Sequence, residues 1–294
     1  MATGGTPAGR PRPVDAVAIA RARARLESVP QPPWLHEQAA QRMAQRLSLV
    51  RQPPQQAVDW WPAAGASAQA LAQALPRARI TRLGEPQAVR RASWWSPWRA
   101  PAPDRGEASV DLVWANMLLH HVADPVPLIE QWHRALRVGG LLMFSTLGPG
   151  TLAALRERYR QAGWGPPMAD LVDMHDVGDM LVQAGFADPV MDQEVLRLSW
   201  ASAQDALWEL RTLGANAAPD RFAGLRTPAW RARLLDALRS CGAADGSGRV
   251  ELEFELVYGH AVKPEPRFRV APEARIDAED LRRSLRAHPP GRGA

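Results

Sequence analysis

Residues 110–146 hold two short apolar runs on either side of an amphipathic stretch. The runs VDLVWA at 110–115 and LLMFST at 141–146 are rich in branched and aromatic side chains, which favour buried strands. Residues 125–137 have the apolar spacing of a helix, and we expect the glycine pair that follows to end it. A strand, a helix and a second strand in this order predict two parallel strands, and therefore a sheet of the α/β class.

Further elements of similar length extend this unit in both directions. Short apolar runs predict strands, and stretches with helical periodicity between them predict helices. The expected helices lie at 34–50, 67–75, 125–137, 151–162 and 176–184, and the expected strands at 57–61, 79–83, 110–115, 141–146 and 189–200. Residues 202–240 are expected to be helical around an irregular break at 214–228.

Residues 250–262 (VELEFELVYGHAV) alternate apolar and acidic side chains at their start. Val250, Leu252 and Phe254 share one face of a strand, and the interleaved glutamates share the other. A strand with one solvated face is typical of antiparallel pairing. We therefore expect a mostly parallel, Rossmann-like α/β sheet with a late antiparallel strand, preceded by a helical insertion at about 202–245.

The composition is that of an ordinary globular chain. Of 294 residues, 46% are hydrophobic and 23% are charged, and no stretch approaches the 18 apolar residues of a membrane span. Cys241 is the only cysteine, which excludes an internal disulfide and fits a reducing compartment. We expect a cytoplasmic protein with a disordered, basic segment over 1–26 that includes a solvated helix. The domain itself is expected over 27–263, followed by a polar tail over 264–294.

The positive charge is concentrated in the two ends of the chain. Residues 1–26 hold five arginines and one acid, for a net +4, and residues 264–294 hold seven arginines and five acids, for +2. The whole chain carries +5, so residues 27–263 are left with −1. A balanced domain disfavours nucleic acid as a partner, because such proteins gather basic residues on one face. We expect no membrane partner either, and the oligomeric state stays open.

The sequence contains no recognisable metal-binding or nucleophile motif. His120 and His121 follow a strand and His133 lies in the next helix; adjacent histidines usually point apart, so we expect no metal site. Asp173 stands at a helix start, where a carboxylate acts as a cap. No G-x-S-x-G is present and Cys241 has no evident histidine partner, which disfavours a hydrolase. The absence of G-x-x-x-x-G-K excludes a P-loop nucleotidase.

Several segments carry a resemblance to a known family. Residues 109–152 (SVDLVWANMLLHHVADPVPLIEQWHRALRVGGLLMFSTLGPGTL) resemble the central block of class I S-adenosylmethionine-dependent methyltransferases. A narrower resemblance, to the malonyl-acyl-carrier-protein O-methyltransferases of biotin synthesis, comes from DMHDVGDMLVQAGFADPVMDQE (173–194), LWELRTLGAN (207–216) and FELVYGHAVKP (254–264). Together the similar segments span about 109–264.

The resemblance implies methyl transfer from S-adenosyl-L-methionine to the free carboxylate of a malonyl thioester. The thioester would be carried by acyl carrier protein, or be a small acyl thioester, and its methyl ester would enter pimelate synthesis. A carboxylate is already a nucleophile, so this reaction needs no general base. Alignment of the reactants and exclusion of water are then the main catalytic devices, which agrees with a sequence that has no catalytic triad and no metal motif.

The resemblance also implies which residues lie near the cofactor. Asp59 matches the acid that ends the first strand, and Gly65 matches the last glycine of the loop after it. Glu85 stands one residue beyond the place of the acid that holds the ribose. Asn116 ends its strand at the expected pocket, where its amide would meet the amino-acid end of the cofactor.

The first half of the chain departs from the family pattern. Trp61 and Ala63 stand where the family has glycines, which allow unusual backbone angles and close approach of the ligand. Trp94 and Trp95 replace the usual Gly-Asp of the third strand. Two explanations stay open: a reshaped cofactor pocket that uses the extra indoles, or a non-catalytic relative that binds a carrier or enzyme partner.

On the substrate side, three residues are candidates for catalysis. His120 is expected at the mouth where the methyl group is transferred. Arg211, and with less support Arg221, would pair with the malonyl carboxylate through a bidentate contact. Because carrier proteins are acidic, we also expect an arginine-bearing rim near the pocket that attracts them.

Overall fold

The computed structural model describes residues 13–28, 31–48, 50, 52–62, 66–83, 109–214, 216–242 and 247–266. The chain divides into two compact units, Met1–Pro264 and Glu265–Ala294. The described residues lie almost wholly in the first unit. The polar tail expected over 264–294 lies almost wholly outside the described residues and stays a prediction.

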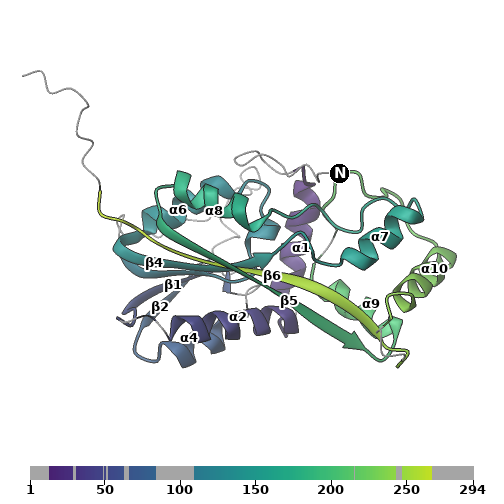
Figure 1. The fold of residues 1–294 in the computed structure, drawn as a ribbon, viewed down its shortest axis with the longest axis horizontal. Coiled ribbons are helices and arrows are strands. Elements are labelled where there is room, and N and C mark those ends of the chain that lie inside the picture. Colours follow the sequence, from purple (N-terminus) through teal and green to yellow (C-terminus); the bar gives the residue numbers. More distant parts are fainter. Residues whose placement is uncertain are drawn as a thin grey trace, which may run out of the picture. The chain divides into compact units, whose positions relative to one another are not determined.

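The described residues form one six-stranded sheet with the order β2-β1-β3-β4-β6-β5 (Figure 1). Its strands are β1 (Gln56–Trp60), β2 (Arg79–Leu83), β3 (Val110–Ala115), β4 (Leu136–Leu147), β5 (Ala187–Trp200) and β6 (Val250–Val262). β2, β1, β3 and β4 pair in parallel, whereas β6 runs antiparallel to both of its neighbours. The expected mostly parallel sheet with a late antiparallel strand is therefore confirmed.

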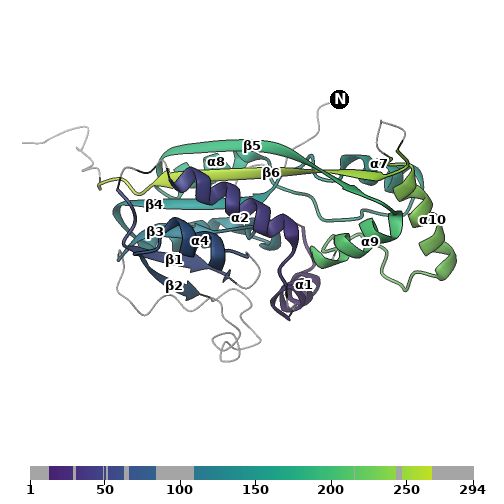
Figure 2. The ribbon, with the colours of Figure 1, turned by 90° about the horizontal axis from the view of Figure 1, so that it is seen from below.

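Helices cover both faces of this sheet (Figure 2). They are α1 (Ala16–Ser28), α2 (Trp34–Leu47), α4 (Ala68–Ala74), α6 (Pro125–Ala135), α7 (Ala153–Gln161), α8 (Met174–Gln183), α9 (Ala203–Thr212) and α10 (Pro228–Arg239), with the short 3₁₀ turn η1 (Leu119–His121) after β3. α2 and α4 lie on one face, and α6 and α8 on the other (Figure 1). α9 and α10 lie between β5 and β6 in the chain, which confirms the helical insertion. Within the described ranges, none of these helices has the length and apolar content to cross a bilayer.

The boundary between α6 and β4 differs most from the sequence prediction. α6 ends at Ala135 and β4 begins at once with Leu136, so the glycine pair lies inside the strand instead of ending the helix. Gly139 has a φ of +75°, which glycine adopts at little cost, and its N–H donates to the Lys263 carbonyl.

The core has two parts, one on each face of the sheet, because successive side chains of a strand point to opposite faces. Leu112 and Trp114 point to the face covered by α2 and α4, while Val113 and Ala115 point to the face covered by α6 and α8. All four side chains are fully buried. Burial on both faces explains why the parallel strands read as continuous apolar runs in the sequence.

α1 is not the solvated helix that we expected within a disordered segment over 1–26. Its Ile19, Ala22 and Leu26 are buried, and Leu26 belongs to the same apolar core as the end of β1. Asp15 accepts hydrogen bonds from two N–H groups of the first turn, as a helix cap does. From Asp15 onward this segment therefore packs as part of the folded unit.

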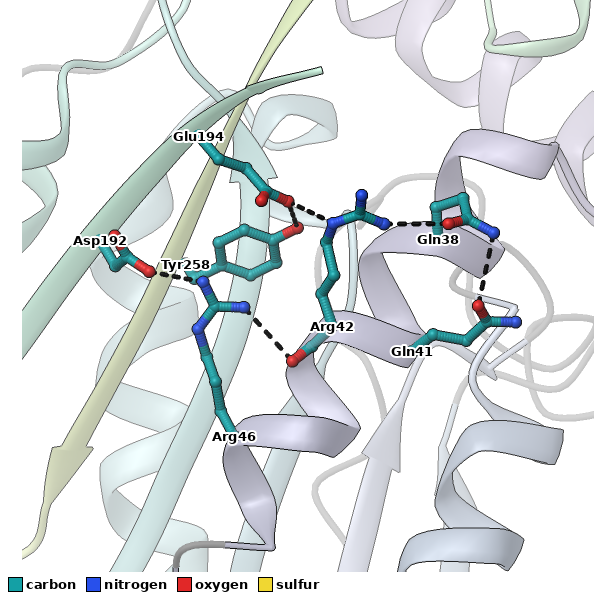
Figure 3. A network of polar contacts seen from close by, with 7 residues as sticks. All are labelled: Gln38, Gln41, Arg42, Arg46, Asp192, Glu194 and Tyr258. Atoms are coloured by element: carbon teal, nitrogen blue, oxygen red, sulfur yellow. Dashed lines mark hydrogen bonds and ion pairs between the residues drawn. The ribbon is translucent and has the colours of Figure 1, made fainter. Parts of the chain in front are cut away.

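α2 is tied to the edge of the sheet by polar contacts that Figure 3 shows. Arg42 pairs with Glu194 at 2.7 Å and Arg46 pairs with Asp192 at 2.5 Å. Tyr258 donates its hydroxyl to Glu194 at 2.7 Å, and the Arg46 guanidinium lies 4.0 Å from the centre of the Tyr258 ring. Burial, together with Glu194, raises the pKa of Tyr258, so this donor stays protonated. The network fixes the position of α2 over β5 and β6.

Gly259 in β6 offers a test of this packing. A Cβ atom at this position would overlap the Phe144 ring and approach the Met191 sulfur to 3.0 Å. We predict that Gly259→Ala lowers the free energy of unfolding by about 1–3 kcal/mol through overpacking. Gly178→Ala is the matched control, because its Cβ would meet nothing closer than 3.6 Å and α8 gains helix propensity. Urea unfolding of both variants makes the measurement, and equal midpoints would contradict the packing described here.

Candidate functional site

A cavity of about 400 Å³ lies among α1, η1, α7, α9, α10, the end of β4 and Phe254 of β6. Its wall is mainly apolar, with Leu147, Leu152, Leu155, Leu207, Leu210, Leu234 and Phe254 among the lining residues. Arg25, His120, His121 and Arg211 add polar and basic groups, and no acidic residue lines it among those that the structure describes. A cavity of this kind suits a ligand with an anionic end and an apolar body.

The expected arginine-bearing rim is present beside this cavity. Arg211 at the end of α9 also lines a second cavity of about 400 Å³, together with Arg226 and Arg231. The second cavity again has no acidic lining residue in the described part of the chain. Arg211 is exposed, so its guanidinium can meet a ligand that arrives from solvent.

His120 lines the cavity, and its role at the mouth of methyl transfer stays a prediction. Its Nδ1 is 3.3 Å from the Thr146 hydroxyl at the end of β4. The rings of His120 and His121 are only 4.2 Å apart between centres, so the expectation that they point apart is wrong. His36 from α2, which the sequence reasoning missed, joins them, whereas His133 packs edge-on against Phe186 elsewhere.

Asp59 is buried near the end of β1, with 1% of its surface exposed. Burial raises its pKa to about 7, although the Arg82 charge and the Ser67 hydroxyl pull the pKa down. Within the described ranges neither carboxylate oxygen has a hydrogen-bond partner. A buried carboxylate in this state is costly once it ionises.

Asn116 is also buried, at the end of β3. Its amide nitrogen donates to the His36 carbonyl at 2.8 Å, and its amide oxygen accepts from the Ser145 hydroxyl at 2.5 Å. The side chain therefore joins the start of α2 to β4. Its assignment to the cofactor stays a prediction, because in this arrangement the amide is engaged by protein groups.

Trp61 follows β1 directly, with a left-handed backbone at a φ of 70°. That conformation costs a residue with a side chain about 1–2 kcal/mol. The indole is buried, and its N–H donates to Glu27 of α1 at 2.7 Å. Arg23 lies 4.7 Å from the ring centre, and His121 meets the ring edge-on at 5.6 Å. The side chain therefore fills the space between β1, α1 and η1.

Among the sequence-predicted site residues that the structure describes, His120 and Arg211 line this cavity, whereas Asp59, Asn116 and Arg221 do not. Arg221 does not line it; its guanidinium pairs with Asp15 at 2.5 Å and donates to the Ala218 carbonyl, which gives it a structural role instead. Gly65 and Glu85 lie outside the described residues, as do Trp94 and Trp95. By contrast, Asp173 caps α8 as predicted, by accepting from the His175 N–H.

The fold defines this chain as a class I methyltransferase-type α/β protein. A methyltransferase domain family matches residues 99–144. Phosphoethanolamine N-methyltransferase 2 of Haemonchus contortus superposes with a TM-score of 0.45 at 14% identity, over 85% of this chain and 58% of that chain.

Two curated relatives are more specific. A malonyl-[acyl-carrier protein] O-methyltransferase of Gallionella capsiferriformans is 36% identical over 79% of this chain and 85% of the relative. A protein of the same name from Laribacter hongkongensis is 34% identical over 87% of this chain and 89% of the relative. The chain belongs to the malonyl-[acyl-carrier protein] O-methyltransferase family.

S-adenosyl-L-methionine is the methyl donor of this family, and the described residues fit it only in part. The orphaned carboxylate of Asp59 stands where the family places its acid. At residue 61, however, the buried indole covers the backbone that a glycine would leave open. A donor seated against this turn would meet the indole of Trp61.

The raised pKa of Asp59 gives a pH-dependent stability. The pKa of Asp59 is about 7 in the folded state, above the ordinary value of 3.8. The contribution of Asp59 to the stability of the folded state is therefore fully present below about pH 4 and is lost as the pH rises to 7. We predict that Asp59→Asn, which mimics the neutral acid, is more stable than the parent at pH 8 by up to about 4 kcal/mol. At pH 4 the two should be equal. Urea unfolding of both proteins from pH 4 to pH 8 measures this difference in stability. A difference that does not change with pH would contradict the description of Asp59 as a buried, unpaired acid.

Proposed function

We propose that this chain transfers a methyl group from S-adenosyl-L-methionine to the free carboxylate of a malonyl thioester carried by acyl carrier protein, in biotin synthesis. Family membership sets the reaction. The observation that carries the proposal is the cavity, whose apolar wall has arginines at its edge and no acidic residue among the described lining. That environment favours a carboxylate attached to a thioester chain.

The chain's own residues act on the substrate side of this reaction. Arg211, with Arg25 across the cavity, holds the malonyl carboxylate by charge and hydrogen bonds. His120 lies at the same wall, where its ring can orient the carboxylate. The leucine-rich wall excludes water, which would otherwise solvate the nucleophilic oxygen. When bound, the donor would supply a methyl group on a sulfonium: the carboxylate oxygen would bond to the methyl carbon as the carbon–sulfur bond breaks, a neutral thioether would leave, and no proton would be transferred.

The basic rim supports a carrier-borne substrate. Arg211, Arg226 and Arg231 line the second cavity, which adjoins the first through Leu207 and Leu234. Acyl carrier proteins are acidic, so such a rim raises the rate of encounter and orients the carrier. A small acyl thioester would enter the same cavity without this help. A cytoplasmic location stays a prediction.

One observation favours a second function. Trp61, with its indole bonded to Glu27, occupies the side of the site where the family's glycine-rich loop receives the donor. A chain that keeps this arrangement at all times would bind the carrier without methylating it. The second candidate is therefore a non-catalytic, carrier-binding relative.

The substrate side can be tested at Arg211. We predict that Arg211→Gln raises KM for malonyl-acyl carrier protein about 10–100-fold, since loss of a charged hydrogen-bond pair costs about 1.5–3 kcal/mol. Arg211→Lys should recover only part of this, because it lacks the guanidinium fork. The measurement uses methyl-labelled donor and follows the labelled methyl ester on the carrier by mass spectrometry.

Arg160→Gln is the matched control, because Arg160 is exposed on α7 and pairs only with surface groups of its own helix in the described structure. Equal KM values for Arg211→Gln and Arg160→Gln would contradict the assignment of Arg211. If the unaltered chain binds the carrier but forms no ester, the second function replaces the first.

A further inference from the structure

Three of the chain's seven histidines meet at one place. His36 comes from the first turn of α2, and His120 and His121 come from η1 after β3. One ring nitrogen of each lies within 4.8 Å of the others. His36 and His121 are buried and His120 is half-buried. The rings therefore converge from two separate elements of the fold.

Three converging imidazoles are a donor set for a divalent transition metal. Imidazole nitrogen suits Zn²⁺, Co²⁺, Ni²⁺ and Cu²⁺, and three histidines with one open position form a known type of zinc site. Zn–N bonds of about 2.0–2.1 Å in a tetrahedron place the nitrogens about 3.4 Å apart. The ring nitrogens here lie within 4.8 Å of one another, so they must move about 1 Å closer together to bind the metal. Small side-chain rotations provide this movement.

The rings of His120 and His121 each have a neighbour that can orient them, and His36 is held through its backbone. The Thr146 hydroxyl lies 3.3 Å from Nδ1 of His120. The side-chain amide of Asn116 donates a hydrogen bond of 2.8 Å to the backbone carbonyl of His36. The Trp61 indole stands edge-on to His121, with 86° between the planes. Such outer contacts fix ring orientation in metal sites and tune affinity.

The cluster faces the cavity on one side. His120 and His121 line it, as do the arginines at positions 25 and 211. A metal held here would have its fourth position directed to the cavity, where water or a carboxylate would complete the coordination. The nearby arginines favour an anionic fourth ligand over a neutral one.

We propose that His36, His120 and His121 bind a divalent transition metal of the zinc type at the wall of the cavity. The site links α2 to η1, so an occupied site stabilises the folded state. The proposal rests on geometry alone and does not depend on methyl transfer.

The test titrates the full, tag-free chain with Zn²⁺ against a chromophoric chelator, and with Co²⁺ by visible absorption. We expect one tight site per chain and a Co²⁺ spectrum of low coordination number. His36→Gln should weaken Zn²⁺ binding by at least about 100-fold, and Thr146→Val by about 10-fold, as outer-shell changes do. Zn²⁺ should also raise the Tm of the unaltered chain, and this shift should vanish in His36→Gln.

His175→Gln is the matched control, because this histidine is exposed on α8 and meets Asp173. It should bind Zn²⁺ like the unaltered chain. If His36→Gln does not fold, His120→Gln takes its place, because His120 is only half-buried. The proposal is overturned if no stoichiometric site is found, or if the cluster variants bind Zn²⁺ as tightly as His175→Gln.

Discussion

The hydrogen bond from the Trp61 indole to Glu27 joins the end of β1 to α1, and the rest of the site depends on it. Trp61 keeps the left-handed backbone that suits a glycine, at a cost of about 1–2 kcal/mol. Burial of the indole, its charged acceptor and the Arg23 cation above the ring offset this cost. With α1 fixed in this way, its inner face forms one wall of the cavity.

The substrate side and the donor side of the site therefore differ in how far they depart from the family pattern. On the substrate side, β4, β6 and the α9–α10 insertion build an apolar cavity with a basic edge, in agreement with the family reaction. On the donor side, Asp59 is present but buried without a partner in the described structure, and Trp61 covers the neighbouring backbone. We therefore expect binding of the donor to displace the indole from Glu27.

The sheet could be predicted from the sequence because its signals are local. The apolar runs of β3 and β4, and the alternation at the start of β6, depend only on burial of one or both faces of a strand. The site could not be predicted as fully, because its contacts join distant segments. The pairing of Arg221 with Asp15 and the approach of His36 to His120 leave no periodic signal. The burial of α1 was missed because its arginines hide a short apolar stripe in the sequence.

The most direct test of the Trp61–Glu27 contact is the affinity for S-adenosylhomocysteine. It is measured by calorimetry in the unaltered chain, in Trp61→Gly and in Glu27→Ala. Trp34→Ala, at an exposed tryptophan, serves as the control. The account predicts that both Trp61→Gly and Glu27→Ala bind at least about 10-fold more tightly than the unaltered chain, because no buried indole bond must be broken first. Affinities equal to those of the unaltered chain and the control would contradict it.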